Sequence, residues 1–135
     1  PLTVPSDYVG VMNLWPGLWR DLVLNGLFSW PVVPPKLRFV LLKLYGFNIE
    51  PSIVSGGVWF GSRSVTIRRG AFINRGCFFN TAAPILLEEK VNLGMEVMLI
   101  TGSHDIGKMP RRAGDAWAAP IRIGAGAWLG ARVLV

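Results

Sequence analysis

The sequence predicts an all-β fold, a three-sided parallel solenoid, with short helices ahead of it. A period of six residues runs through the second part of the chain, and proline-broken segments of helical character come before it. The chain has 135 residues, of which 51% are hydrophobic, and this suffices for one domain with a sizeable core. We divide the chain into an apolar helical segment, residues 1–47, and a solenoid, residues 48–135.

The N-terminal segment is interrupted by prolines, which lack an amide donor and bias the preceding residue away from helix. The breaks are Trp15-Pro16, Trp30-Pro31 and Pro34-Pro35. The longest uncharged stretch, Leu22–Pro35, is shorter than the roughly 20 apolar residues of a spanning helix, so we predict no membrane span. Residues 36–45, "KLRFVLLKLY", favour a helix that Gly46 ends. This helix would pack on its own chain, on another subunit or on an anionic membrane.

The six-residue repeat can be followed directly from residue 67. The hexads are "IRRGAF" (67–72), "INRGCF" (73–78), "FNTAAP" (79–84), "LEEKVN" (87–92), "LGMEVM" (93–98), "LITGSH" (99–104), "IGAGAW" (123–128) and "LGARVL" (129–134). Each begins with Ile, Leu or Phe, and the fifth residue is often small or β-branched. A fixed period of this kind indicates a repeat fold.

Six residues fit one short strand and one tight corner, so three hexads make one turn of a coil with three flat faces. We expect the aliphatic first residue to point into the prism and the fifth residue to lie where the corner closes. Gly94, Gly124 and Gly130 directly follow the aliphatic position, and we expect them at corners that require unusual backbone angles. Each turn pairs only with its neighbours, so the ends need caps.

The repeat resembles the hexapeptide-repeat acyltransferases, through "FINRGC" (72–77), "LITGSHDI" (99–106) and "APIRIGAGAWLGARVLV" (119–135). The nearest branch comprises the galactoside, maltose and virginiamycin acetyltransferases and the polysaccharide O-acetyltransferases. The resemblance covers residues 48–135. It implies a left-handed parallel β-helix, a homotrimer with active sites between neighbouring prisms, and acetyl-CoA as the acyl donor. Relatives continue beyond the position of Val135, so we expect the solenoid to be truncated at its C-terminal end.

The only histidine, His104, is the catalytic base that the resemblance implies. Acyl transfer from a thioester to a hydroxyl needs a group that removes the hydroxyl proton, and a neutral imidazole suits this near neutral pH. His104 ends a hexad where the next coil is interrupted, so its ring should emerge at the rim of a cleft. A surface histidine with a structural role is the alternative.

Asn74, in "FIN", stands where related acetyltransferases place an acceptor-binding asparagine. With 18 residues in a coil and two extra at the slip at Ile85–Leu86, Asn74 should lie on an earlier turn than His104. Its amide is expected to orient the acceptor hydroxyl or to stabilise the charge of the tetrahedral intermediate. A corner asparagine that bonds to its own backbone is the alternative.

The interruption, residues 105–120, is expected to be an excursion loop of the kind that this family extends toward the neighbouring active site. Asp115 matches a position where relatives carry an acidic residue, and it is a candidate to orient His104. Asp105 competes for this role. The loop is also basic, either as a solvated surface or as an attractor of CoA phosphates, through Lys108, Arg111 and Arg112.

By the same resemblance, Trp128 and Ala131 in "AWLGAR" are expected to line the tunnel for the pantetheine arm of CoA. Corner packing is the alternative for Trp128. Cys77 occupies a fifth hexad position, and we interpret it as structural. One Cys and one His are too few for an ordinary zinc shell, so no metal is expected.

The formal net charge of +6 favours anionic partners such as phosphates, nucleic acid or a lipid surface. We expect no nucleic-acid partner, because the sequence has neither the aromatic platforms nor the recognition motifs of such proteins. A single cysteine excludes an internal disulfide framework. We therefore expect a cytoplasmic protein, peripheral at the inner face of the membrane if the N-terminal segment contacts lipid.

These features predict an acetyl-CoA-dependent O-acetyltransferase that acts on a saccharide hydroxyl, in surface polysaccharide or related glycan modification. In the expected reaction His104 deprotonates the acceptor hydroxyl, the oxygen attacks the thioester in a ternary complex, and CoA leaves. Two alternatives stay open. One is an antibiotic O-acetyltransferase of the same family. The other is a non-catalytic hexapeptide-repeat scaffold, although its metal-binding branch needs several histidines.

Overall fold

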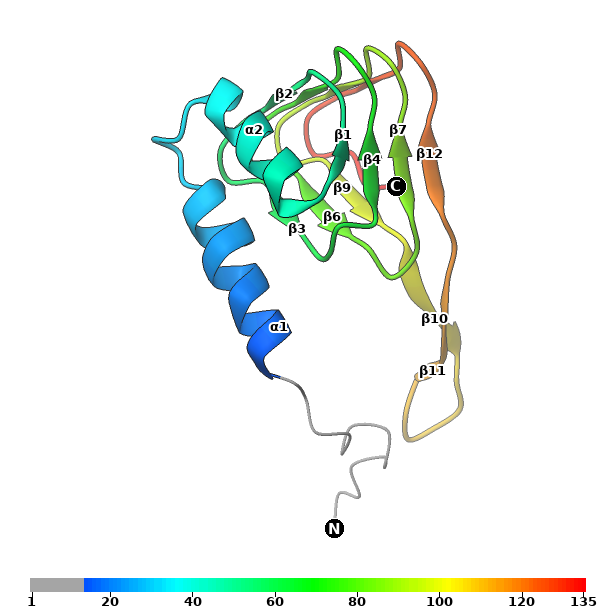
Figure 1. Ribbon diagram of the computed structural model, residues 1–135. Coiled ribbons are helices and arrows are strands. Elements are labelled where there is room, and N and C mark those ends of the chain that lie inside the picture. Colours follow the sequence, from blue (N-terminus) through cyan, green and yellow to red (C-terminus); the bar gives the residue numbers. More distant parts are fainter. Residues whose placement is uncertain (1–13) are drawn as a thin grey trace.

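The computed structural model describes residues 14–135 (Figure 1). Its helical part comprises α1 (Leu14–Trp19), a π-helical continuation η2 (Arg20–Phe28) and α2 (Pro35–Tyr45). The strands are β1 (Asn48–Ile49), β2 (Ile53–Val54), β3 (Trp59–Phe60), β4 (Val65–Ile67), β5 (Phe72–Ile73), β6 (Phe78–Asn80), β7 (Ile85–Leu87), β8 (Asn92–Leu93), β9 (Met98–Ile100), β10 (Gly102–Ile106), β11 (Ala113–Ala118), β12 (Ile121–Ile123) and β13 (Trp128–Leu129).

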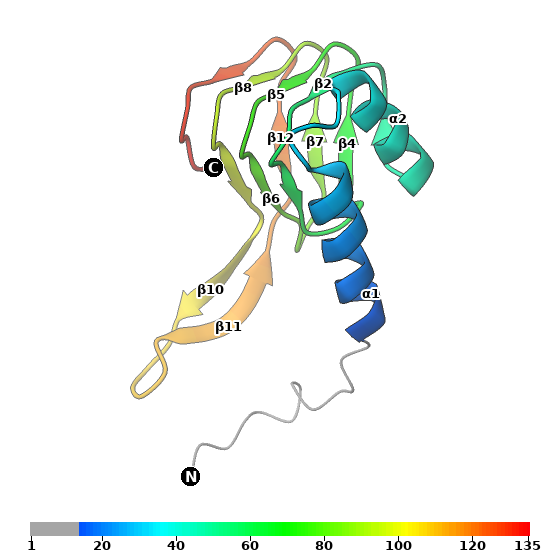
Figure 2. The same ribbon diagram turned by 90° about the vertical axis from the view of Figure 1, so that its left-hand side faces the viewer.

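The short strands form three parallel sheets that the chain visits in rotation (Figure 2). The first sheet has the order β1-β4-β7-β12, the second β2-β5-β8-β13 and the third β3-β6-β9. In the second sheet Ile73 pairs with Leu93, an offset of 93 − 73 = 20 residues, which equals the 18 of an ordinary coil plus the two at the slip. Parallel sheets joined in this cyclic order are compatible with the predicted three-sided solenoid, while the handedness of the coil stays a prediction.

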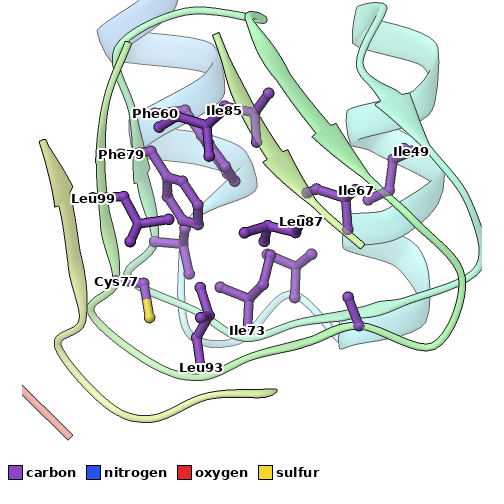
Figure 3. Close-up of a cluster of buried hydrophobic side chains, with 14 of the residues drawn as sticks. Ile49, Phe60, Ile67, Ile73, Cys77, Phe79, Ile85, Leu87, Leu93 and Leu99 are labelled. Atoms are coloured by element: carbon purple, nitrogen blue, oxygen red, sulfur yellow. The ribbon is translucent and has the colours of Figure 1, made fainter. Parts of the chain in front are cut away.

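The core confirms which hexad positions point inward. The first residues of the hexads between 67 and 104 are almost completely buried, and Figure 3 shows them converging on the interior of the coil: Ile67, Ile73, Phe79, Leu87, Leu93 and Leu99. Four of the six fifth residues in this range are buried as well, Ala71, Cys77, Val91 and Val97, whereas Ala83 is half-buried and Ser103 is exposed on the hairpin. One inward aliphatic residue per face in each turn therefore builds a continuous core from very short strands.

The corners with left-handed backbone conformation lie at another hexad position than the sequence predicts. The left-handed backbone conformation falls on the fourth residue of the hexad, at Gly70, Gly76 and Gly126, and even at Lys90, Glu96 and Arg132. The expectation that Gly94, Gly124 and Gly130 adopt it was wrong, because they hold the second position and lie outside that region. Gly94 is needed for a different reason: a Cβ there would lie 2.6 Å from the backbone nitrogen of Ala131 on the next coil.

The helices cover the first coil, as both ribbon views show (Figures 1 and 2). The predicted helix at 36–45 is confirmed; it starts one residue earlier, at Pro35, and ends at Gly46 in the left-handed conformation. Pro16 does not break a helix as expected but lies in the first turn of α1, where a missing amide donor costs nothing. Among residues 14–135, no helix combines the length and apolar character needed to cross a bilayer.

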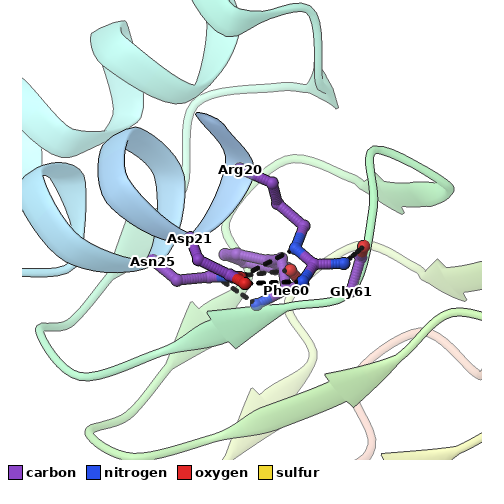
Figure 4. Close-up of polar contacts among 5 residues, drawn as sticks. All are labelled: Arg20, Asp21, Asn25, Phe60 and Gly61. Atoms are coloured by element: carbon purple, nitrogen blue, oxygen red, sulfur yellow. Dashed lines mark hydrogen bonds and ion pairs between the residues drawn. The ribbon is translucent and has the colours of Figure 1, made fainter. Parts of the chain in front are cut away.

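Polar side chains of η2 bind the open edge of the first coil (Figure 4). The side-chain amide of Asn25 pairs with Phe60 as a strand residue would, donating to its carbonyl at 3.1 Å and accepting from its N–H at 2.9 Å. Arg20 donates to the carbonyl of Gly61 at 3.3 Å while it is ion-paired with Asp21. These bonds satisfy backbone groups of β3 and of Gly61 directly after it, which would otherwise be an unpaired edge.

Arg38 joins the helices to the solenoid. Its guanidinium is almost completely buried and donates to four backbone carbonyls, those of Phe28, Trp30, Val33 and Val54, at 2.7 to 2.8 Å. The acceptors come from η2, from the turn that follows it and from β2. One side chain therefore fixes the positions of three segments.

The predicted excursion loop at 105–120 is a two-stranded hairpin in the structure. β10 and β11 pair in antiparallel fashion, with Gly102 opposite Ala118 and His104 opposite Ala116. The hairpin projects from the body of the coil in both ribbon views (Figures 1 and 2). β12 then rejoins the first sheet beside β7, where Ile121 pairs with Ile85.

Replacing Arg38 by Met tests its role as the joint. The variant leaves four carbonyls without a donor, and we expect the free energy of unfolding to fall by about 3–5 kcal/mol. Urea denaturation measures this fall. The control is Arg75→Met, an exposed arginine whose loss should change stability by less than about 0.5 kcal/mol. Equal stability of the two variants would show that the Arg38 bonds contribute little.

Gly94 and Gly130 form a matched pair, since both hold the second hexad position but only Gly94 is crowded. A Cβ on Gly130 meets nothing within 4 Å. We expect Gly94→Ala to lower the free energy of unfolding by about 1–3 kcal/mol through overpacking, and Gly130→Ala to leave it nearly unchanged. Chemical denaturation of both variants measures the difference. Similar losses at the two positions would contradict close approach as the reason for Gly94.

Candidate active site

His104 lies in the middle of β10, on the hairpin, and is exposed to solvent. Directly opposite residues of an antiparallel pair share one face, so His104 and Ala116 lie on the same side of the hairpin. Gly102 and Ala118, the next pair on that side, are also small. The imidazole therefore stands among small neighbours.

The root of the hairpin is held by Thr101, which is buried and directly precedes β10. Its hydroxyl donates to the backbone carbonyl of Asn80 at 2.9 Å and accepts from the N–H of Ala83 at 2.9 Å. On the returning strand, the N–H of Ala119 donates to the carbonyl of Thr101 at 2.9 Å. His104 is therefore three residues from a fixed anchor, which limits the positions that its ring can reach.

Among residues 14–135, no carboxylate is bonded to His104. Asp105 and Asp115 are each adjacent in sequence to a residue of the His104–Ala116 pair, at the irregularity where the strand register shifts between His104 and Ile106. No hydrogen bond links either aspartate to His104 among residues 14–135. The assignment of Asp115, or of Asp105 in its place, as the carboxylate that orients His104 stays a prediction.

Asn74 and Trp128 line one pocket on the outer face of the second sheet. The pocket has a volume of about 310 Å³ and is lined by Phe72, Asn74, Asn92, Leu93, Gly94 and Trp128. Phe72 pairs with Asn92, and Asn92 pairs with Trp128, so three successive coils contribute to it. Two residues predicted to bind different substrates, Asn74 for the acceptor and Trp128 for CoA, are brought together.

The side chain of Asn74 serves both the corner and the pocket. Its Oδ1 accepts a hydrogen bond of 2.8 Å from the N–H of Arg75, the local bond expected of a corner asparagine. Its Nδ2 donates to no partner among residues 14–135, and the side chain is half-buried at the edge of the pocket. The amide donor is thus available to an oxygen atom of a ligand.

Ala131 lies one coil corner beyond Trp128, beside a second hollow of about 340 Å³ that Met95, Glu96 and Arg132 also line. Arg132 is ion-paired with Glu96 at 2.7 Å, and this pair raises the pKa of the Arg132 guanidinium. Gly94 lines the first pocket and approaches Ala131, so the two hollows are neighbours. The predicted CoA residues therefore share one side of the solenoid.

His104 is not part of the pocket that Asn74 and Trp128 line. Asn74 directly follows β5 of the second sheet, whereas the hairpin leaves the solenoid after β9 of the third sheet. Asn74 does lie one coil earlier than Leu99, as the repeat predicted, because Phe79 pairs with Leu99. Within a single chain the proposed base and the proposed acceptor site are therefore separate.

Other reactive groups do not extend the site. Cys77 is buried in the core, where burial raises the pKa of its thiol, so it is a poor nucleophile. In the described part of the chain, no group of three or more His, Cys, Asp or Glu side chains is placed to hold a metal. The exposed basic residues of the hairpin, Lys108, Arg111 and Arg112, form no ion pair with residues 14–135.

Sequence reasoning missed two residues at these places. Asn92 is the sixth residue of its hexad, like Phe72 and Trp128, and counting sixth positions along the second sheet would have put all three in one outward ladder. The pattern of the repeat around Thr101 does not indicate its role, because that role depends on a hydrogen bond to Asn80 of the preceding coil.

Comparison with known proteins gives one informative similarity. Over 107 residues, 79% of this chain, the sequence is 30% identical to a Schizosaccharomyces pombe protein that is provisionally named an acetyltransferase. The aligned region covers 42% of that protein, so the chain spans less than half the length of this relative. No family model matches the chain. No solved structure matches it either.

Proposed function

We propose that this chain forms the core of an acetyltransferase that moves an acetyl group from acetyl-CoA to a hydroxyl of a saccharide. The similarity to the yeast protein supports acetyl transfer in general. The period of six and the parallel coil support membership of the hexapeptide-repeat acyltransferases, with a left-handed coil. Surface polysaccharide or related glycan modification is the expected role, as for the nearest branch of that resemblance.

The observation that carries the proposal is the setting of His104. The only histidine of the chain is held on an anchored hairpin, exposed, and flanked by glycine and alanine. A base must reach within hydrogen-bond distance of the proton it removes, so an accessible ring on a fixed support suits the task. A histidine with only a structural role would be expected to bond to its surroundings, and His104 has no such bond among residues 14–135.

In the proposed reaction, Nε2 or Nδ1 of neutral His104 accepts the proton of the acceptor hydroxyl as its oxygen attacks the thioester carbon. The C–S bond then breaks, the imidazolium returns its proton to the sulfur, and CoA leaves as the thiol. The Asn74 amide donates to the acceptor or to the developing oxyanion. Trp128 and Ala131 lie along the path of the pantetheine arm.

The separation of His104 from the Asn74 pocket supports the proposal of a homotrimer. In such a trimer the hairpin of one copy reaches the second-sheet pocket of its neighbour, and the two halves of the site meet between chains. A carboxylate that orients His104 would then come from the other copy, with Asp115 as the first candidate and Asp105 as the second. The exposed basic residues of the hairpin would face CoA phosphates.

Replacement of His104 by Ala tests the catalytic role. We expect kcat/KM for CoA release, with acetyl-CoA and a panel of saccharides, to fall by about 10²–10⁴-fold, because general base catalysis supplies that factor. Ser103→Ala is the matched control, since Ser103 lies on the same strand but on the opposite side of the hairpin. Both variants should keep the wild-type melting temperature.

Retained turnover in His104→Ala would contradict the assignment of the base. Turnover with an antibiotic but with no saccharide would move the acceptor to the alternative class. Absence of any thioester cleavage by full-length wild-type protein would favour a non-catalytic scaffold.

A further inference from the structure

The outer side of α2 is apolar although nothing in the described chain covers it. Leu37, Val40 and Leu44 are exposed and follow one another three and four residues apart, which places them in one stripe. Arg38 and Leu42 occupy the opposite side and are buried against the coil. Leu44 is 80% exposed. An amphipathic surface helix usually turns its apolar side toward the core, but these three apolar residues face solvent.

The neighbouring helices and the turn after them also expose large apolar side chains. η2 packs against α2 and buries Leu24, while Leu22 of η2 and Trp19 of α1 are more than half exposed. Trp30 is also 58% exposed, in the proline-containing turn between η2 and α2. We call the exposed apolar side chains Trp19, Leu22, Trp30, Leu37, Val40 and Leu44 the outer cap face. Large apolar side chains exposed on neighbouring elements indicate an interaction site.

The charges that α2 carries beside the outer cap face are all positive. Lys36 and Lys43 lie seven residues apart on α2, both exposed, and neither is ion-paired with residues 14–135. The single acidic residue of the helical part between residues 14 and 47, Asp21, is bound to Arg20 and Asn25. An apolar surface flanked only by available cations is complementary to an anionic partner.

A groove beside α2 is also lined by apolar side chains and by a lysine. It has a volume of about 580 Å³ and lies between α2 and the corner of the first coils, with Phe39, Val40, Ile53 and Phe72 among its lining residues and Lys36 at its edge. An apolar groove next to a single lysine suits an acyl chain whose anionic headgroup meets the ammonium.

A second copy of the chain would fit this surface poorly. In a two-fold interface the same patch meets itself, so Lys36 and Lys43 would face the same lysines without a carboxylate to pair them. Tryptophan and lysine around an aliphatic stripe are instead the composition of helices that lie in the interface of a membrane.

We propose that the outer cap face docks the protein on an anionic lipid bilayer. α1, η2 and α2 lie along the surface without crossing it, with the aliphatic stripe and the tryptophans at the level of the headgroups and the lysines against anionic lipid. The proposal is independent of the chemistry assigned to His104, which lies on the hairpin. It would place the solenoid next to membrane-attached glycans.

Co-sedimentation of the full-length protein with vesicles tests the docking. We expect binding to phosphatidylcholine vesicles that contain phosphatidylglycerol, and much weaker binding to phosphatidylcholine alone. Lys36→Glu/Lys43→Glu should weaken binding to the anionic vesicles by at least about 25-fold, since each basic residue near such a surface contributes about fivefold. Leu37→Ser/Leu44→Ser, which keeps the charges, should weaken it by about tenfold or more.

The matched control is Lys108→Glu/Arg111→Glu, which changes the net charge equally but lies on the hairpin. This variant should bind anionic vesicles nearly as wild type does. Loss in the hairpin variant equal to or greater than that in the Lys36/Lys43 variant would overturn the proposal, because net charge or the hairpin would then be responsible. Unchanged binding in the Lys36/Lys43 variant would also overturn the proposal. So would a wild-type protein that binds neither vesicle type. In that case, a change of oligomeric state in Leu37→Ser/Leu44→Ser would assign the outer cap face to a second copy of the chain. Turnover on soluble saccharides should be the same as in wild type in the two cap-face variants, Lys36→Glu/Lys43→Glu and Leu37→Ser/Leu44→Ser.

Discussion

The structure depends on one constraint: every coil of a parallel solenoid must pair its backbone with the coil before it and the coil after it. Strands of two or three residues are too short to be stable alone, and they persist because each inward residue, such as Ile73 or Leu93, also packs on the same position one coil away. The constraint leaves the first coil with an open edge. Asn25 and Arg20 bind the backbone of β3, and Arg38 bonds the helices to one another and to β2. The N-terminal helices are thus a cap that the solenoid requires.

The same constraint explains where chemistry is placed. Because the inward residues of a hexad are buried in the core, a ligand can be contacted only by outward residues or by a segment that interrupts the coil. The sixth residues of the second sheet form the ladder of Phe72, Asn92 and Trp128, which lines the pocket beside Asn74. The interruption after Thr101 forms the hairpin that carries His104. The pocket lies on the second sheet, whereas the hairpin leaves the solenoid after the third sheet. This separation is the reason for proposing a site between copies.

Much of the fold follows from local rules in the sequence. The inward hexad positions, the offset of 20 residues across the slip and the α2 helix with its Gly46 end were predictable because each depends on neighbours in the chain or on the period. The corner angle was misplaced by two residues, since Lys90, Glu96 and Arg132 adopt the left-handed conformation that glycine usually signals. Arg38 gave no signal, because its four acceptors are carbonyls, which every residue has. The pairing of His104 with Ala116 could not be predicted, because it depends on the strand register of a segment that the sequence indicates only as a loop.

The central claim is an acyl-transfer site shared between copies, with His104 from one chain and the Asn74 pocket from another. Subunit complementation tests it most directly. His104→Ala and Asn74→Ala are made as separate proteins, each impaired alone, and are then co-expressed so that mixed oligomers form. A shared site recovers about a quarter of wild-type CoA release, because one interface in four then combines an intact His104 with an intact Asn74. Activity of the mixed oligomers that stays at the average of the two separate variants would contradict the account.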